Sequence, residues 1–193
     1  MLFIETKLKN AFIIEPERIE DHRGFFARAW CKDEFEAHGL NACLVQCNLS
    51  FNRYQGTIRG MHYQESPHEE TKIVRCTRGA VFDVIIDLRR ESATYLKWIG
   101  AELTAENRKM IYVPEGFAHG YQTLENNTEV FYQTSQFFSP GSERGVRWND
   151  PTFAIEWRVS DNLVISDKDR SWQEYVVADR FHKPTGMFEH DNC

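Results

Sequence analysis

The sequence lacks any long apolar segment of the kind that a transmembrane helix requires. Hydrophobic residues make up 41% of its 193 residues, but no run reaches the ~18 consecutive apolar residues of such a helix. The first residues, MLFIETKLKNAF, also lack the charged start and apolar run of a secretory signal peptide. We therefore expect a protein of the cytoplasm that does not associate with membranes.

An excess of basic residues is missing as well. The chain carries 23 Lys and Arg against 29 Asp and Glu, for a formal net charge of -6. Backbone phosphates of nucleic acids and anionic membranes are bound by basic faces, so we expect neither as a partner. An anionic ligand must then be held by a few local cations.

Cysteines are few and irregularly spaced. There are 5 in the chain, an odd number, and no two of them form a CxxC pair. Neither a disulfide framework nor a zinc knuckle is indicated, and we interpret the cysteines as reduced thiols that mostly fill the core.

Short apolar segments separated by Gly, Pro, Asn and Ser fill most of the chain from Asn41 onward, which favours a β sandwich or barrel. In AVFDVIIDLR (80–89), apolar residues alternate with Asp83 and Asp87, as expected of a half-buried strand. Only 31–40 and 166–175 are typical of short helices. Without repeats or linkers, we expect one domain over 1–193 with a tail from about 176.

The stretch from Arg59 to Lys72, RGMHYQESPHEETK, gathers groups suited to proton transfer. His62 can accept a proton near neutral pH, while Arg59 holds an anion and Lys72 stabilises developing negative charge. The alternative is a solvated loop with scattered charges.

PEGFAHGY (114–121) has the order P-x-G-x-x-H, which resembles the second motif of the cupin superfamily. The first cupin motif requires H-x-H, but here the matching residues are His62, Tyr63 and Gln64. A carboxamide is a poor ligand for a transition metal beside imidazole, and catalytic metal sites need at least three good ligands. We therefore expect no metal, and His62 is free to act as a base.

A closer resemblance is to the dTDP-4-dehydrorhamnose 3,5-epimerase family and covers residues 1 to about 175. It is carried by DHRGFF (21–26), Q-x-N-x-S (46–50), RGMHYQ (59–64), DVIIDLR (83–89), VPEGFAHGY (113–121) and SDKD (166–169). The resemblance implies an all-β, cupin-type jelly roll with a few short peripheral helices. It also implies a homodimer that uses no cofactor and acts on a nucleotide-diphosphate sugar.

The resemblance also implies roles for particular residues. His62 matches the base, Tyr132 the proton donor on the opposite face and Asp169 the group that orients the imidazole. Lys72 matches the enolate stabiliser, with His119 nearby in the pocket. The matching substrate-binding residues are Arg59 for the diphosphate and Arg23, Phe26, Arg28, Gln46, Asn48, Phe138, Glu143 and Lys168 for further contacts.

Several of these residues have structural alternatives. His119 can be a hydrogen-bonded structural histidine, Tyr132 an aromatic side chain of the core, and Asp169 a helix cap. We interpret Asp83 and Asp87 as structural.

Two departures from the family pattern concern the nucleobase. The family usually has glutamate where this chain has Arg28, and often tyrosine where it has Phe138. In the family, the glutamate's role implies accepting a hydrogen bond from the ring N–H of thymine, whereas arginine offers only donors. Cytosine presents an acceptor at that ring position, so the nucleotide can be CDP instead of dTDP.

Together with these residues, the resemblance implies an epimerase that inverts carbon 3, carbon 5 or both of a nucleotide-linked 4-keto-6-deoxyhexose for polysaccharide or lipopolysaccharide building. One alternative is a nucleotide-sugar ketoisomerase, which needs its base and donor placed differently. The other is a non-catalytic nucleotide-sugar-binding cupin, which gives no reason to retain base, donor and lysine together.

Overall fold

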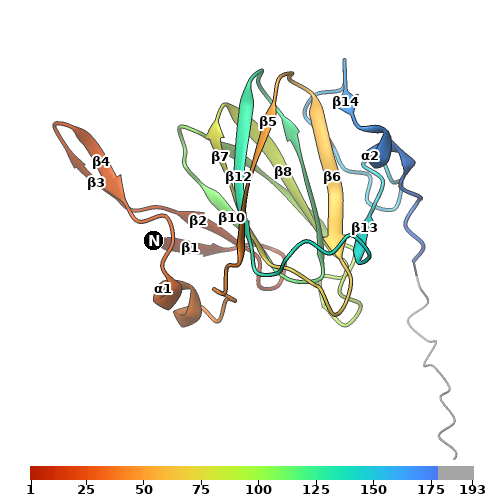
Figure 1. The fold of residues 1–193 in the computed structure, drawn as a ribbon, viewed down its shortest axis with the longest axis horizontal. Coiled ribbons are helices and arrows are strands. Elements are labelled where there is room, and N and C mark those ends of the chain that lie inside the picture. The colour runs from red at the N-terminus through yellow and green to blue at the C-terminus, as the bar shows by residue number, and fades with distance from the viewer. Residues whose placement is uncertain (178–193) are drawn as a thin grey trace, which may run out of the picture.

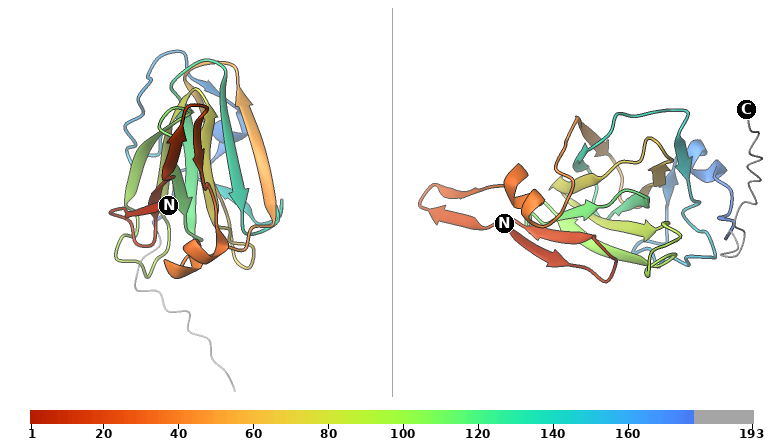
Figure 2. Two further views of the ribbon diagram at one scale, coloured as in Figure 1. Left: turned by 90° about the vertical axis from the view of Figure 1, so that its left-hand side faces the viewer. Right: turned by 90° about the horizontal axis from the view of Figure 1, so that it is seen from below.

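The computed structural model describes residues 1–177, and most of them form two β-sheets that face each other (Figure 1). Figure 2 (left) shows the strands of both sheets aligned along roughly one axis, as in a flattened barrel. This is a β jelly roll with two short helices, so the predicted fold class is confirmed. Most of the predicted tail, 176–193, lies outside the described residues, and the single domain stays a prediction.

The first sheet has the strand order β1-β2-β10-β7-β12-β5. All of its paired strands are antiparallel. The bounds are β1 Leu2–Glu5, β2 Phe12–Glu15, β5 Gln46–Asn52, β7 Lys72–Arg78, β10 Met110–Val113 and β12 Thr128–Thr134.

The second sheet has the order β13-β6-β11-β8-β9, and β14 pairs with β6 in parallel. Its bounds are β6 Thr57–Gln64, β8 Ala80–Asp87, β9 Trp98–Thr104, β11 Phe117–Thr123, β13 Glu143–Gly145 and β14 Val164–Ile165. The sequence pattern does not indicate β13 or β14, which are too short to show a period.

The core between the sheets is built from alternate residues of the strands. Val74 and Cys76 of β7 face Val81 and Ile85 of β8 across this layer, with Val130 of β12 among them. Because side chains alternate along a strand, polar residues two positions further on share the same inner face. The apolar core therefore grades into a polar interior at one end.

The prediction that 80–89 forms a half-buried strand is wrong, because β8 is buried along its whole length. Its second face, with Phe82, Val84 and Ile86, is covered by residues of the C-terminal segment, among them Phe153 and Trp157. Alternation gives the two faces correctly, but it does not show that a later segment covers the outer one.

Two outlying elements lie at opposite ends of the molecule. The hairpin of β3 (Arg18–Asp21) and β4 (Gly24–Ala27) projects beyond the first sheet next to α1 (Lys32–Ala37), while α2 (Asp167–Ser171) lies beside β6 (Figures 1 and 2). Both helices were predicted, and Ser166 caps α2 by accepting from the N–H of Asp169. No helix among residues 1–177 is long and apolar enough to cross a membrane.

Candidate active site

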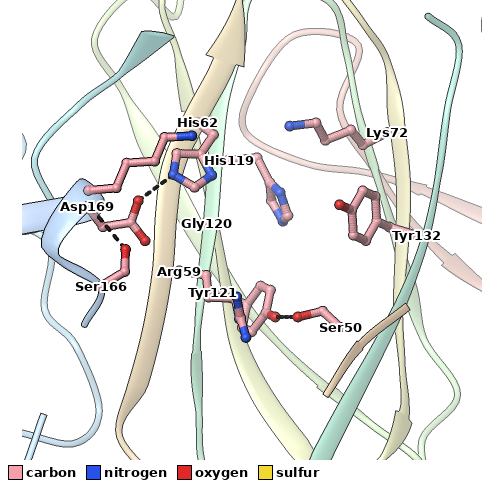
Figure 3. Close-up of a pocket in the computed structure, with 11 residues that line it drawn as sticks. Ser50, Arg59, His62, Lys72, His119, Gly120, Tyr121, Tyr132, Ser166 and Asp169 are labelled. Atoms are coloured by element: carbon pink, nitrogen blue, oxygen red, sulfur yellow. Dashed lines mark hydrogen bonds and ion pairs between the residues drawn. The ribbon is translucent and has the colours of Figure 1, made fainter. Parts of the chain in front are cut away.

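A cavity of about 310 Å³ opens between the two sheets (Figure 3). It adjoins a second cavity of about 340 Å³, and His62, Lys72 and Tyr132 line both. β6 and β11 of the second sheet supply one wall, and β7 and β12 of the first sheet supply the other. Arg59, His62 and Lys72 of the polar stretch therefore line a pocket, while residues 65–67 between β6 and β7 form an exposed loop.

A β-bulge in β6 brings Arg59 and His62 to the same cavity. His119 of β11 pairs with His62, but Tyr121 pairs with Arg59, so three steps on β6 match two on β11. In a regular strand, residues three apart point to opposite faces. Gly60 makes the bulge possible, with φ of 117° and a position where a Cβ atom would lie 2.6 Å from the Cα of Gly120.

His62 is held by Asp169. Its Nε2 lies 2.6 Å from Oδ1 of Asp169, and Asp169 is only 4% exposed. Burial raises the pKa of the Asp169 carboxyl, but hydrogen bonding and charge from His62, together with bonds from Ser166 and Gly60, outweigh it, so the net pKa is lowered. An ionised carboxylate only accepts, so Nε2 carries the hydrogen and Nδ1 of the neutral ring keeps the lone pair that can take a proton.

His119 has a carboxylate partner of its own. Its Nε2 lies 2.9 Å from Oδ2 of Asp83, which is fully buried in β8. Asp83 is thus not only a residue of the fold, since it fixes a side chain that lines the cavity. Asp87, by contrast, accepts bonds from Arg89, Ser92 and Thr94 in the turn that follows its strand, which agrees with a structural role.

The opposite wall carries Tyr132 and Lys72, which face the two histidines across the cavity in Figure 3. Burial raises the pKa of the Tyr132 phenol, and the nearby Glu70 raises it further, so the hydroxyl keeps its proton at neutral pH. Nζ of Lys72 lies 3.0 Å from Oε1 of Glu70, and both side chains are nearly buried, at 10% and 12% exposed. The arrangement combines a proton acceptor on one wall with a proton donor and a cation on the other.

The adjoining cavity contains most of the remaining predicted substrate contacts. It is lined by Gln46, Asn48, Phe138 and Glu143 among others. Gln46 donates to Asn48 and accepts from the backbone of Phe138, and Glu143 forms an ion pair of 2.5 Å with Lys168 of α2. These residues, far apart in sequence, lie together beside the catalytic candidates.

Gln64 lines the second cavity, but its side-chain amide is occupied by backbone groups. Its amide nitrogen donates to the carbonyls of His68 and Phe137, and its oxygen accepts from the N–H of Ser139 at 2.6 Å. The side chain therefore joins two loops. Within residues 1–177, no group of three or more His, Cys, Asp or Glu side chains could hold a metal ion.

Three predicted nucleotide contacts do not lie at this site. Arg23, Phe26 and Arg28 are in or next to the β3–β4 hairpin, at the end of the molecule away from α2 (Figure 1). Arg23 pairs with Asp21, and Arg28 pairs with Glu34 of α1 at 2.9 Å. A single chain therefore does not bring them to the cavity, and their role stays a prediction.

The sequence analysis missed several polar residues of the site. Ser50 and Tyr121 line the first cavity, Glu70 lines the second, and Asn52 lies behind Arg59. The alternation of Gln46, Asn48 and Ser50 along β5 could have extended to Asn52. Nothing in the local sequence indicates that Glu70 forms an ion pair with Lys72.

Comparisons with known proteins agree with this geometry. A family model described as dTDP-4-dehydrorhamnose 3,5-epimerase matches residues 5–176. A protein of that name from Shigella flexneri is 43% identical over 182 residues, which is 94% of this chain and 99% of the relative.

Two solved structures share the fold. The Bacillus anthracis enzyme of the same name, with TDP and PPi bound, has a TM-score of 0.87 and 40% identity, covering 90% of this chain and 99% of that one. A Legionella pneumophila dTDP-6-deoxy-D-glucose-3,5-epimerase in complex with dTDP-4-keto-L-rhamnose has a TM-score of 0.84 and 34% identity, covering 90% and 92%. The chain belongs to the dTDP-4-dehydrorhamnose 3,5-epimerase family, and thus to the isomerases.

Proposed function

We propose that the chain inverts carbon 3, carbon 5 or both of a nucleoside-diphosphate-linked 4-keto-6-deoxyhexose without a cofactor. Its relatives are named for the dTDP-linked sugar, whereas Arg28, if it contacts the base, favours a CDP-linked one. The observation that carries the proposal is the pocket that has the His62–Asp169 pair on one wall and Tyr132 on the other. A cytoplasmic location and a place in deoxysugar biosynthesis are part of the proposal.

Proton removal begins the reaction. A C–H bond beside the keto group breaks, its proton passes to Nδ1 of His62, and the electron pair moves through the carbonyl to give an enolate oxygen at carbon 4. Asp169 supports the resulting imidazolium, because its ionised carboxylate lies 2.6 Å from Nε2. Lys72 stabilises the negative charge as it accumulates on the oxygen.

Inversion requires a proton on the opposite face of the enolate. The phenol of Tyr132 supplies it, since its raised pKa keeps it protonated at neutral pH. To restore the enzyme, the phenolate that remains takes a proton from solvent and the imidazolium of His62 releases its proton to solvent. Arg59 grips the diphosphate, because a guanidinium binds phosphate oxygens in a bidentate way.

The ketoisomerase is the second candidate in the same class, since it also forms an enolate. It transfers a proton between neighbouring carbons on one face, and a donor on the opposite wall has no use in such a reaction. A binding protein without catalysis leaves both carboxylate-held histidines unexplained. The two-walled arrangement therefore favours the epimerase.

We also propose that the protein acts as a homodimer in which the β3–β4 hairpin of one chain reaches the nucleotide of the other. Ile19 and Phe26 of the hairpin are each 70% exposed and Phe25 is 40% exposed, so the hairpin offers apolar surface to a partner. The predicted contacts of Arg23, Phe26 and Arg28 require such an arrangement, because these residues lie far from the cavity of their own chain.

A mixing experiment tests the dimer. His62→Ala and the double variant Arg23→Ala/Phe26→Ala are each expected to have low activity, but their mixed dimer has one site with intact parts. Activity should return on mixing under conditions that exchange subunits. Monomers by analytical ultracentrifugation, or no regained activity in a verified mixed dimer, would refute this arrangement.

The activity itself is tested with dTDP-4-keto-6-deoxyglucose in deuterated water. NMR should show deuterium at carbon 3, carbon 5 or both, together with an inverted product. Transfer of the keto group to another carbon would select the ketoisomerase, and binding without exchange would select the non-catalytic protein.

A further inference from the structure

Arg59 differs from the other cationic or imidazole side chains that line the cavities. His62, His119, Lys72 and Lys168 each lie within ion-pair distance of a carboxylate, namely Asp169, Asp83, Glu70 and Glu143. Arg59 forms no ion pair within the part of the chain that the structure describes. Its Nε donates instead to Oδ1 of Asn52 at 2.7 Å.

Asn52 is buried, with 2% of its surface exposed, and its orientation is determined by its neighbours. Its amide nitrogen lies 3.3 Å from the backbone carbonyls of Ser50 and Thr128 and from the hydroxyl of Tyr121. A flipped amide would turn its oxygen toward two carbonyl oxygens and its NH2 group toward the N–H of Arg59. The oxygen must therefore face Arg59.

Tyr121 and Ser50 extend this network into the cavity. The hydroxyl of Tyr121 lies 2.8 Å from Oγ of Ser50, and Figure 3 shows this pair below the histidines. Both residues line the cavity together with Arg59. The hydrogen bonds of Asn52 thus tie Arg59 to β5, β11 and β12 at once.

We propose that Asn52 positions Arg59 to bind the diphosphate. It holds the guanidinium by Nε and leaves the positive charge of Arg59 uncompensated. This inference rests on the proposed function, in which Arg59 binds the diphosphate. An arginine held through Nε still has both terminal NH2 groups for phosphate oxygens. A carboxylate in the place of Asn52 would hold the same atom but would cancel the charge that attracts the ligand.

Asn52→Asp tests this, because it keeps the shape of the side chain and adds one negative charge beside Arg59, although it also loses the amide N–H bonds to the carbonyls of Ser50 and Thr128. Inorganic pyrophosphate is the probe, titrated by calorimetry. We expect its affinity to fall about tenfold to a hundredfold, the loss typical of a charged hydrogen bond. With the nucleotide sugar, KM should rise and kcat should change by less than about threefold, because the base and donor are untouched.

Two further variants separate charge from folding. Asn52→Ser removes the contact to Arg59 without adding charge, and it should weaken pyrophosphate binding less than Asn52→Asp does. Asn10→Asp adds the same charge at an exposed position of left-handed backbone, which aspartate tolerates, and it should bind as wild type does. Circular dichroism identifies any variant that has failed to fold, in which case Asn52→Ser decides.

Arg59→Ala distinguishes failure of this inference from failure of the proposed function. If Arg59→Ala binds pyrophosphate as tightly as wild type, the diphosphate grip of Arg59 is wrong. If Arg59→Ala weakens binding but both folded Asn52 variants bind normally, only the role of Asn52 is wrong. In the double variant Asn52→Ser/Arg59→Ala, we expect little loss beyond that of Arg59→Ala, because Asn52 acts through Arg59.

Discussion

Nε2 of His62 and Oδ1 of Asp169 lie 2.6 Å apart, although 107 positions separate the residues in the chain. The pairing depends on α2, which packs beside β6 and carries Asp169 into the wall of the cavity. A helix of five residues is not stable in isolation. The proposed base therefore depends on a short element that only tertiary contacts hold in place.

Replacing Asp169 by asparagine should lower kcat by about a hundredfold or more. The amide can donate to Nε2 and favour the wrong tautomer, and it does not support the imidazolium, so much of the ~10²–10⁴ contribution of a general base is lost. Steady-state kinetics check this. Asp167→Asn, in the same turn of α2 but exposed, is the matched control. A kcat for Asp169→Asn within a few-fold of wild type would show that the carboxylate is not needed.

Asp169 should also affect stability at acid pH. Its folded-state pKa is lowered, so its ionised form stabilises the fold above the unfolded value of about 3.9. That stabilisation is lost as pH falls through the lowered folded value. Denaturant titrations from pH 6 down to about pH 2 should show a smaller drop in unfolding free energy for Asp169→Asn than for wild type. If the unfolding free energies of wild type and Asp169→Asn fall equally steeply with pH, the lowered pKa of Asp169 is contradicted.

Tyr132→Phe should slow inversion more than it slows wash-out of the substrate proton. Removal of the proton by His62 does not need the phenol, whereas delivery to the opposite face does. Mass spectrometry of recovered substrate and chiral analysis of product measure the two rates. Equal loss of both would indicate that Tyr132 positions the sugar or takes part in both steps.

Arg28 is predicted to favour CDP over dTDP. A guanidinium offers only donors, which suits the ring acceptor of cytosine and not the ring N–H of thymine, and an unmatched buried group costs about 1–3 kcal/mol. Parallel titrations of both nucleotides should show CDP binding roughly tenfold to a hundredfold more tightly, and Arg28→Glu should narrow or reverse the preference. The ion pair with Glu34 competes with this contact. A wild-type preference for dTDP would refute the prediction.

Much of the fold could be predicted because its strands are short, alternating and separated by turn residues. The segments from Asn41 onward include most of the observed strands, and the predicted helical segments 31–40 and 166–175 contain α1 and α2. The pairing of distant strands could not be predicted, because alternation determines the face of a side chain but not its neighbour. For the same reason the burial of β8 on both faces was missed.

The candidate site was likewise predicted only in part. The family resemblance identified His62, Tyr132 and Lys72, which line one cavity. Strict alternation would have placed Arg59 and His62 on opposite faces of β6. Only the bulge at Gly60 explains why both side chains face the cavity. The position of Arg23 and Arg28 on a projecting hairpin follows from long-range packing, which their motif does not encode.

The most direct test of the account is deuterium exchange by wild type and His62→Ala with dTDP-4-keto-6-deoxyglucose. Wild type should incorporate solvent deuterium at each carbon that it inverts. In His62→Ala, the exchange rate should fall ~10²–10⁴-fold at every one of those carbons. It should still bind dTDP nearly as wild type does, because the imidazole does not hold the diphosphate. Exchange at the normal rate in His62→Ala would contradict the assignment of His62 as the base.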